Sequence, residues 1–127
     1  MNSRLYKRLL DMSFERLHMI DGKTKHFTFI VKKNRIVHMG WNDYNTSHPI
    51  LQKLGYGLKK LHSEVAAIMP FRNNLQSLAG MDIVNTRVNT FGEIKLSKPC
   101  VICAHWVGMV GFKNIYYTDN NGELQKV

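Results

Sequence analysis

Cysteine, proline and acidic residues are all scarce in this chain. Its 127 residues include 2 cysteines, 3 prolines and 9 aspartates or glutamates. Two cysteines cannot build the dense disulfide framework on which small secreted domains rely. Apolar residues make up 44% of the chain, which is enough for one hydrophobic core. We therefore expect a single domain over residues 1–127, held together by packing.

Long hydrophobic runs are missing too. The longest nearly apolar run is Cys100 to Phe112, which is too short to span a bilayer and contains His105. Charged and apolar residues alternate over residues 1–17, so we expect no secretory signal there. These features predict a cytoplasmic, intracellular protein without a membrane partner. In that compartment a stable structural disulfide is disfavoured.

The shortage of acidic residues leaves a net charge of +9, because 18 lysines and arginines face the 9 acidic residues. Such a charge attracts polyanions and phosphorylated small molecules. The basic residues are spread along the chain rather than gathered in one block, so a general role in solubility stays an equal alternative.

Hydrophobic periodicity and turn residues predict an α/β fold. In the N-terminal part we expect a helix that is capped by Asn2 or Ser3 and runs to about Met19, and then a hairpin of strands 26–31 and 35–39 that turns at Lys33-Asn34. The elements expected after it are helical turns from His62 to about Leu78 broken at Pro70, a strand at 81–88, an extended segment at 93–97, a helix at 100–110, and strands at 113–118 and 123–127. This order predicts a three-layer α/β/α sandwich, with one mixed five-stranded sheet between helices on both faces. The short turn at 119–122 leaves no room for a crossover helix, so the last two strands should be antiparallel.

Both cysteines lie in the segment Ser-Lys-Pro-Cys-Val-Ile-Cys at residues 97–103. Such a pair forms a disulfide, a redox dithiol or two ligands of a metal ion. Cys100 and Cys103 have the spacing of two ligands of one tetrahedral zinc. Pro99 fits the first turn of a helix, whose N-terminus would favour thiolates at this point.

A metal site needs at least one further ligand, and histidine is the natural candidate. His62 begins the other internal helix and is followed two residues later by Glu64, as His-Ser-Glu. A histidine on the first helical turn can bind a metal while the carboxylate sits beside its open position. His105 is the alternative third or fourth ligand, and it would close the site as a purely structural one.

The two motifs together, His62-Ser63-Glu64 and Pro99-Cys-Val-Ile-Cys103, resemble the zinc-dependent nucleobase deaminases of the cytidine and deoxycytidylate deaminase-like superfamily. The segment from Ser97 is similar to a subgroup with the pattern S-K-P-C-x-x-C, and the likeness covers about residues 26–127. The resemblance implies the cytidine deaminase-like fold and Zn²⁺ held by His62, Cys100 and Cys103. It also implies that Glu64 carries the proton between a zinc-activated water and the base.

The resemblance also implies contacts to a substrate. Gly40-Trp41-Asn42 looks like the glycine-x-asparagine loop of these deaminases, whose asparagine contacts the nucleoside. Asn42 would therefore bind the sugar or the base edge, and the backbone N–H of Ser63 the carbonyl of the base. Trp41, Tyr44 and Trp106 are candidates for stacking on the base, although aromatic side chains near a core helix or loop are more often packing residues.

These features predict zinc-dependent hydrolytic deamination of cytosine to uracil in a nucleoside or a nucleotide such as deoxycytidylate. A cluster of cations around the Asn42 loop suits a phosphate: Lys32, Lys33, Arg35, Lys53, Lys59 and Lys60. One alternative is a cytosine or adenine deaminase that acts on single-stranded DNA or RNA. Another is a non-catalytic, zinc-stabilised module that binds nucleic acid. The resemblance also implies a homo-oligomer.

Overall fold

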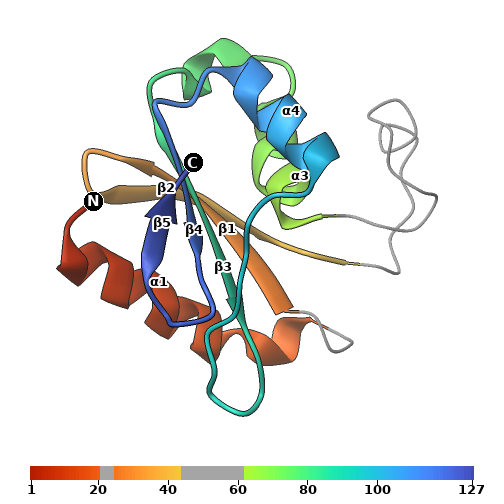
Figure 1. Cartoon of the computed structure of the whole chain (residues 1–127). Coiled ribbons are helices and arrows are strands. Elements are labelled where there is room, and N and C mark those ends of the chain that lie inside the picture. Colours follow the sequence, from red (N-terminus) through yellow and green to blue (C-terminus); the bar gives the residue numbers. More distant parts are fainter. Residues whose placement is uncertain (21–24, 44–61) are drawn as a thin grey trace.

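The computed structural model describes residues 1–20, 25–43 and 62–127 (Figure 1). The α-helices are α1 (Ser3–Glu15), α3 (Ser63–Ile68) and α4 (Val101–Val110). The strands are β1 (Lys25–Lys32), β2 (Arg35–Trp41), β3 (Asp82–Val88), β4 (Asn114–Thr118) and β5 (Leu124–Lys126). Short 3₁₀ turns span Leu17–Met19, Met69–Phe71 and Leu75–Leu78.

Helix α1 is capped as the sequence predicts but is shorter. The side chain of Asn2 accepts a hydrogen bond from the Leu5 N–H at 2.7 Å, which satisfies one of the free donors of the first turn. The α-helix ends at Glu15 rather than near Met19, because Arg16 leaves the helical region at φ −107° and ψ 11°. The expected remainder is a 3₁₀ turn at Leu17–Met19.

The β1–β2 hairpin turns through Lys33 and Asn34, which have positive φ values of 50° and 62°. A turn of this kind matches the right-handed twist of the two strands that it joins. Both strands are longer than predicted, and their register shifts between Ile30 and Val31 at a β-bulge.

The sheet has five strands in the order β2-β1-β3-β4-β5. Strand β3 runs parallel to β4, and the other neighbouring pairs are antiparallel. The predicted mixed sheet and its antiparallel final pair are therefore confirmed. The extended segment after β3 turns back and runs antiparallel to the end of that strand. Val88 and Ile94 form a bridge there, and the Lys95 N–H donates a hydrogen bond of 2.8 Å to the Arg87 carbonyl.

Two apolar clusters lie on opposite faces of this sheet, so the predicted three layers are present (Figure 1). On one face, Leu5 and Leu9 of α1 pack with Phe27 and Phe29 of β1. On the other face, α3, α4 and the 3₁₀ turn at 75–78 cover Ile30 and Ile83. Strand β1 supplies both clusters because alternate side chains of a strand point to opposite faces.

The two internal helices begin close to where the sequence places them. Helix α3 starts at Ser63 with His62 as its cap, and the helical piece expected beyond Pro70 consists of 3₁₀ turns. Helix α4 starts at Val101 with Cys100 as its cap, so Pro99 precedes the helix instead of occupying its first turn. Gly111 ends α4 in the left-handed conformation at φ 89°. In the described part of the chain, no helix is long and apolar enough to cross a membrane.

Candidate metal centre and the cavity beside it

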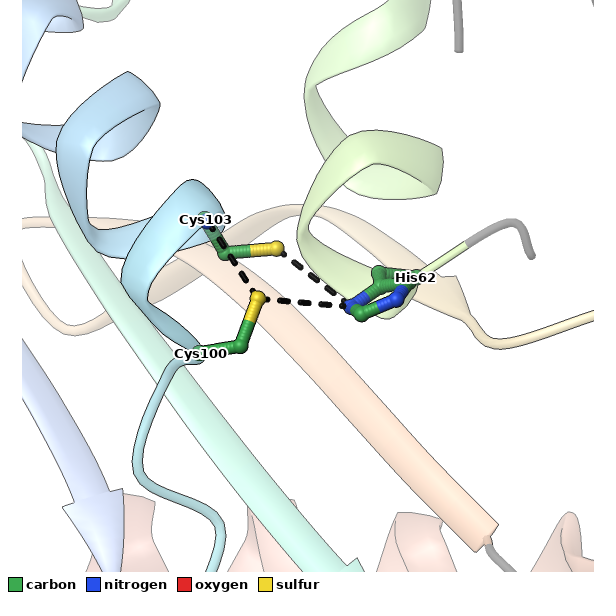
Figure 2. A group of neighbouring side chains, drawn as sticks. All are labelled: His62, Cys100 and Cys103. Atoms are coloured by element: carbon green, nitrogen blue, oxygen red, sulfur yellow. Dashed lines mark hydrogen bonds between the residues drawn. The ribbon is translucent and has the colours of Figure 1, made fainter. Parts of the chain in front are cut away.

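The N-terminal ends of α3 and α4 bring together the three predicted ligands (Figure 2). His62 and Cys100 are the cap residues of the two helices, both in an extended conformation, and Cys103 lies on the first turn of α4. The Cys100 sulfur accepts a hydrogen bond from the Cys103 N–H at 3.4 Å. The N-terminal end of a helix carries a partial positive charge, so this position stabilises a thiolate.

The distances among the ligand atoms suit one tetrahedral ion. His62 Nδ1 lies 3.8 Å from the Cys100 sulfur and 3.5 Å from the Cys103 sulfur. All three ligand atoms lie within 4.8 Å of one another. For zinc bonds of ordinary length, a tetrahedral ion separates its sulfur and nitrogen ligands by about 3.5 Å. The donor set therefore fits a divalent metal such as zinc.

The group is open as well as correctly spaced. Within residues 1–20, 25–43 and 62–127, only His62, Cys100 and Cys103 form such a cluster, and the exposed His105 of α4 is not part of it. No disulfide joins the two cysteines, and the described residues offer this group no fourth protein ligand. Three protein ligands with a fourth position left over are typical of a catalytic zinc rather than a structural one.

Glu64 follows the metal group on α3 and is held in place through a buried hydrogen-bond network. Its Oε1 accepts a hydrogen bond from the Ser63 hydroxyl at 2.9 Å. Thr28 Oγ1 of β1 lies 2.8 Å from Ser63 Oγ and 2.7 Å from Asn85 Oδ1 of β3. All four residues are buried, with Glu64 only 6% exposed. The first turn of α3 is thus fixed to two strands by polar contacts rather than by apolar packing alone.

The metal group borders a cavity of about 130 Å³ that Glu64 also lines. The remaining lining residues are His26, Asn42, Ser63, Ser97 and Lys98, with His62 and Cys100 at the metal side. The cavity therefore brings metal ligands, a carboxylate and neutral hydrogen-bonding groups into one place. Such a combination is typical of a catalytic pocket.

His26 is a cavity residue that sequence reasoning missed, because a lone histidine within an apolar strand pattern looks ordinary. Its pKa is lowered from 6.5 to about 4, mainly by burial and also by the nearby positive charges of Arg87 and His62. Its ring is therefore neutral at pH 7. The only available signal was its place in the first strand, in register with the Asn42 loop.

Of the residues predicted to contact a substrate, two line the cavity: Asn42 and Ser63. Asn42 is buried and lines the cavity, and its Oδ1 accepts a hydrogen bond from the His26 backbone N–H at 2.8 Å. Ser63 also lines the cavity. Trp41 packs against the cluster under α1, on the other face of the sheet, and is not among the residues that line this cavity. Tyr44 lies outside the described residues.

The predicted phosphate-binding cluster is not assembled by the residues that can be placed. Lys32, Lys33 and Arg35 surround the turn of the β1–β2 hairpin, whereas His26 and Asn42 lie at its open end. Six residues of strand separate the two ends by about 20 Å. The prediction was wrong for these three cations, since strand length carries them away from the site. Lys53, Lys59 and Lys60 lie outside the described residues.

Comparison by sequence finds no relative, since no family model and no curated protein matches the chain. Comparison of structures does find similar proteins. The dCMP deaminase of the cyanophage S-TIM5 matches in its apo form with a TM-score of 0.62 at 18% identity, over 94% of this chain and 86% of that one. Its complex with dCMP and dUMP matches with a TM-score of 0.64 at 18% identity, over 94% and 84% of the two chains. The chain has the cytidine deaminase-like fold.

The predicted fold class is thereby confirmed. The sequence resemblance was carried by short motifs, whereas the structural match extends over nearly the whole chain. Within this cytidine deaminase-like fold, the possible metal-binding group is made by the same three side chains that the motifs single out. At 18% identity the match establishes the fold, so the reaction has to be inferred from the site itself.

Proposed function

We propose that the chain is a zinc-dependent deaminase that converts the cytosine of a nucleotide, such as deoxycytidylate, to uracil. One observation carries the proposal: an open His62–Cys100–Cys103 group and the Glu64 carboxylate border the same small cavity. A structural zinc site has no need of a buried acid that is fixed beside a pocket. The S-TIM5 enzyme, which binds dCMP and dUMP on the same fold, supports a cytosine nucleotide as the substrate class.

Zinc on these three side chains would supply a water of lowered pKa as the attacking group. Glu64 then performs the proton transfers. Its Oε1 is held by the Ser63 hydroxyl, which leaves Oε2 to accept a proton and to return it to the ring nitrogen and the departing amine. In the net reaction water adds across the N3=C4 bond of cytosine and the C4–N4 bond breaks to release ammonia, so Glu64 ends in the state in which it began.

Neutral groups of the cavity suit the recognition of a nucleoside. Asn42 holds the start of β1 through its Oδ1, and its amide nitrogen is the part that can reach a sugar hydroxyl or a base edge. The backbone N–H groups of the first turn of α3 have no partners within the helix, so that of Ser63 can bind the carbonyl oxygen of the base. His26 adds a neutral imidazole at the cavity wall.

Metal analysis followed by a substrate panel tests the proposal. We expect about one zinc per chain, and release of ammonia with uracil formation from dCMP, deoxycytidine or a cytosine-containing single-stranded oligonucleotide. Adenosine and an adenine-containing oligonucleotide complete the panel. Zinc without ammonia release from any of these substrates would indicate a zinc-stabilised binding module instead. Reaction with adenine substrates alone would also contradict cytosine deamination.

A further inference from the structure

A row of side chains leads from the catalytic cavity to a second hollow. His26 of β1 is the register partner of Arg87 of β3. The segment after β3 continues this row, because the bridge at Val88–Ile94 places Lys95 opposite Arg87. Opposed residues of an antiparallel pair point to the same face, with Cβ atoms about 5 Å apart. Arg87 and Lys95 therefore lie on the His26 side of the sheet.

The second hollow is larger than the catalytic one and is basic. It has a volume of about 580 Å³ and is lined by Lys25, Arg87, Lys95 and the turn at 88–91. Lys25 precedes His26 in the chain, and Ser97 of the catalytic cavity is two residues from Lys95. The two hollows are thus adjacent, with the His26–Arg87 pair at their border.

Arg87 is the cation of this hollow with the greatest capacity to bind an added anion. The Lys95 ammonium lies 3.3 Å from Glu93 and the Lys25 ammonium donates to the Ile20 carbonyl, so both have partners. Neither ion pair found among the described residues involves Arg87. Its charge also reaches the catalytic cavity, because it is one of the causes that lower the pKa of His26.

We propose that Arg87 binds the phosphate group of the cytosine nucleotide while the base occupies the zinc-side cavity. This assignment rests on the proposed function and gives the phosphate a subsite beyond the cavity that holds the base, whose own cation, Lys98, lies over the ring of Tyr117. A planar guanidinium presents paired N–H donors that match a phosphate, which makes arginine the usual residue for this task. The neutral His26 separates the two subsites, so the base and the phosphate meet different chemistry.

The test compares substrates with and without a phosphate. For wild type and Arg87→Gln, kcat/KM is measured on dCMP and on deoxycytidine, and the ratio of the two values is the readout. A charge-assisted hydrogen bond to phosphate predicts that this ratio falls about 10- to 100-fold in the variant. Arg87→Lys should lower the ratio less, because lysine keeps the positive charge but lacks the paired N–H donors of the guanidinium. Arg8→Gln, an exposed arginine on α1, is the matched control and should leave the ratio unchanged.

A binding measurement separates this inference from the proposed function. Calorimetric titration of the zinc-loaded wild type and Arg87→Gln with dUMP and deoxyuridine gives the corresponding ratio of dissociation constants without turnover. A phosphate preference that Arg87→Gln removes supports the subsite even if deamination fails. Equal ratios in wild type and both Arg87 variants, with melting temperatures unchanged, would overturn it while leaving deamination intact.

A third substrate shows whether the phosphate belongs to a free nucleotide or to a nucleic-acid strand. A single-stranded oligonucleotide with one internal cytosine is compared with dCMP at rising salt, in wild type and in Arg87→Gln. An Arg87 effect on dCMP alone assigns the site to a free nucleotide. An equal effect on the oligonucleotide, with a steep salt dependence, assigns it to a phosphate of the strand. Loss of neither activity in the variant would refute the proposal for both.

Discussion

The two faces of the sheet are built from the same strands but carry different chemistry. Under α1, Phe27 and Phe29 pack with Leu5 and Leu9 into an apolar layer. Under α3 and α4, the side chains of β1 change along the strand from the buried apolar Ile30 to polar Thr28 and then to His26 in the cavity. Strand β3 repeats the change with Ile83, Asn85 and Arg87, the register partners of these three residues.

This comparison separates stability from function within one sheet. The pleat sends alternate residues to opposite faces, so a single strand can anchor a helix on one side and shape a site on the other. The α1 face contributes apolar burial, and its buried Ser13–Thr86 hydrogen bond of 2.7 Å joins α1 to β3 on the face opposite the cavity. The α3 face replaces some apolar packing with buried polar contacts that hold Glu64. Substitutions on the α1 face should therefore mainly lower stability, whereas substitutions on the α3 face should mainly lower activity.

The largest loss of activity should follow Glu64→Gln, which keeps the shape of the side chain but cannot carry a proton. We expect kcat on the cytosine substrate to fall about 10²- to 10⁴-fold. Zinc content should stay at the wild-type level, because Glu64 is not part of the metal group. Glu15→Gln, an exposed carboxylate on α1, is the control. A variant that loses its zinc together with its activity would show that Glu64 supports the metal instead.

The largest loss of stability should come from the opposite face. Phe29 is fully buried under α1, and Phe29→Ala removes most of its packing. We expect the free energy of unfolding to fall by about 3–5 kcal/mol, as measured by urea denaturation. Phe29→Leu should cost less because it leaves a smaller cavity. Well below the melting temperature, kcat of the folded protein should change little, and a parallel loss of kcat would contradict the separation of the two faces.

Much of the fold could be predicted because local signals agreed with it. Asn2 caps α1, Lys33 and Asn34 form the hairpin turn, and the short turn at 119–122 fixes an antiparallel final pair. The errors lie at element ends. The segments Leu17–Met19, Met69–Phe71 and Leu75–Leu78 form 3₁₀ turns where the apolar periodicity predicts continued α-helix. The periodicity indicates which face is buried, but it does not fix the hydrogen-bond pattern of the helix.

The site was only partly predictable from the sequence. The ligand motifs indicated three side chains that the fold brings together, His62, Cys100 and Cys103, because cap positions at two helix starts are local features. The other site residues depend on which face of the sheet each side chain points to. Trp41 and Asn42 are neighbours in sequence, yet Trp41 packs under α1 while Asn42 lines the cavity. The contacts from Thr28 to Ser63 and Asn85 join residues that are 35 and 57 positions apart, so no local pattern could indicate them.

A matched pair of threonines sharpens the comparison between the faces. Thr28 and Thr86 are both fully buried on adjacent strands, and Thr28 faces the site whereas Thr86 faces α1. Thr28→Val and Thr86→Val each remove a hydroxyl and should each lower the free energy of unfolding by about 1–3 kcal/mol. Only Thr28→Val should also lower kcat, by about 10-fold, because it loosens the support of Glu64.

Two further measurements make the threonine comparison decisive. Thr28→Ser restores the hydroxyl and should recover most of kcat, whereas a purely steric role of Thr28 would leave it impaired. KM for the cytosine substrate should change less than kcat in Thr28→Val, since Thr28 does not line the cavity. Equal loss of kcat in Thr28→Val and Thr86→Val would mean that both act through overall stability.

The last effect is absent at neutral pH and appears only in acid, and it again distinguishes the site face. The pKa of His26 is about 4 in the folded chain and 6.5 in an unfolded one, so between these values the unfolded chain binds one more proton. Stability from this residue is therefore fully present above about pH 6.5 and falls by about 1.4 kcal/mol per pH unit toward pH 4. His26→Gln should flatten the pH dependence of the free energy of unfolding over this window, measured by urea denaturation in chelator. The same slope in both proteins would show that the buried imidazole is protonated without cost, and that the cavity is wetter than its burial indicates.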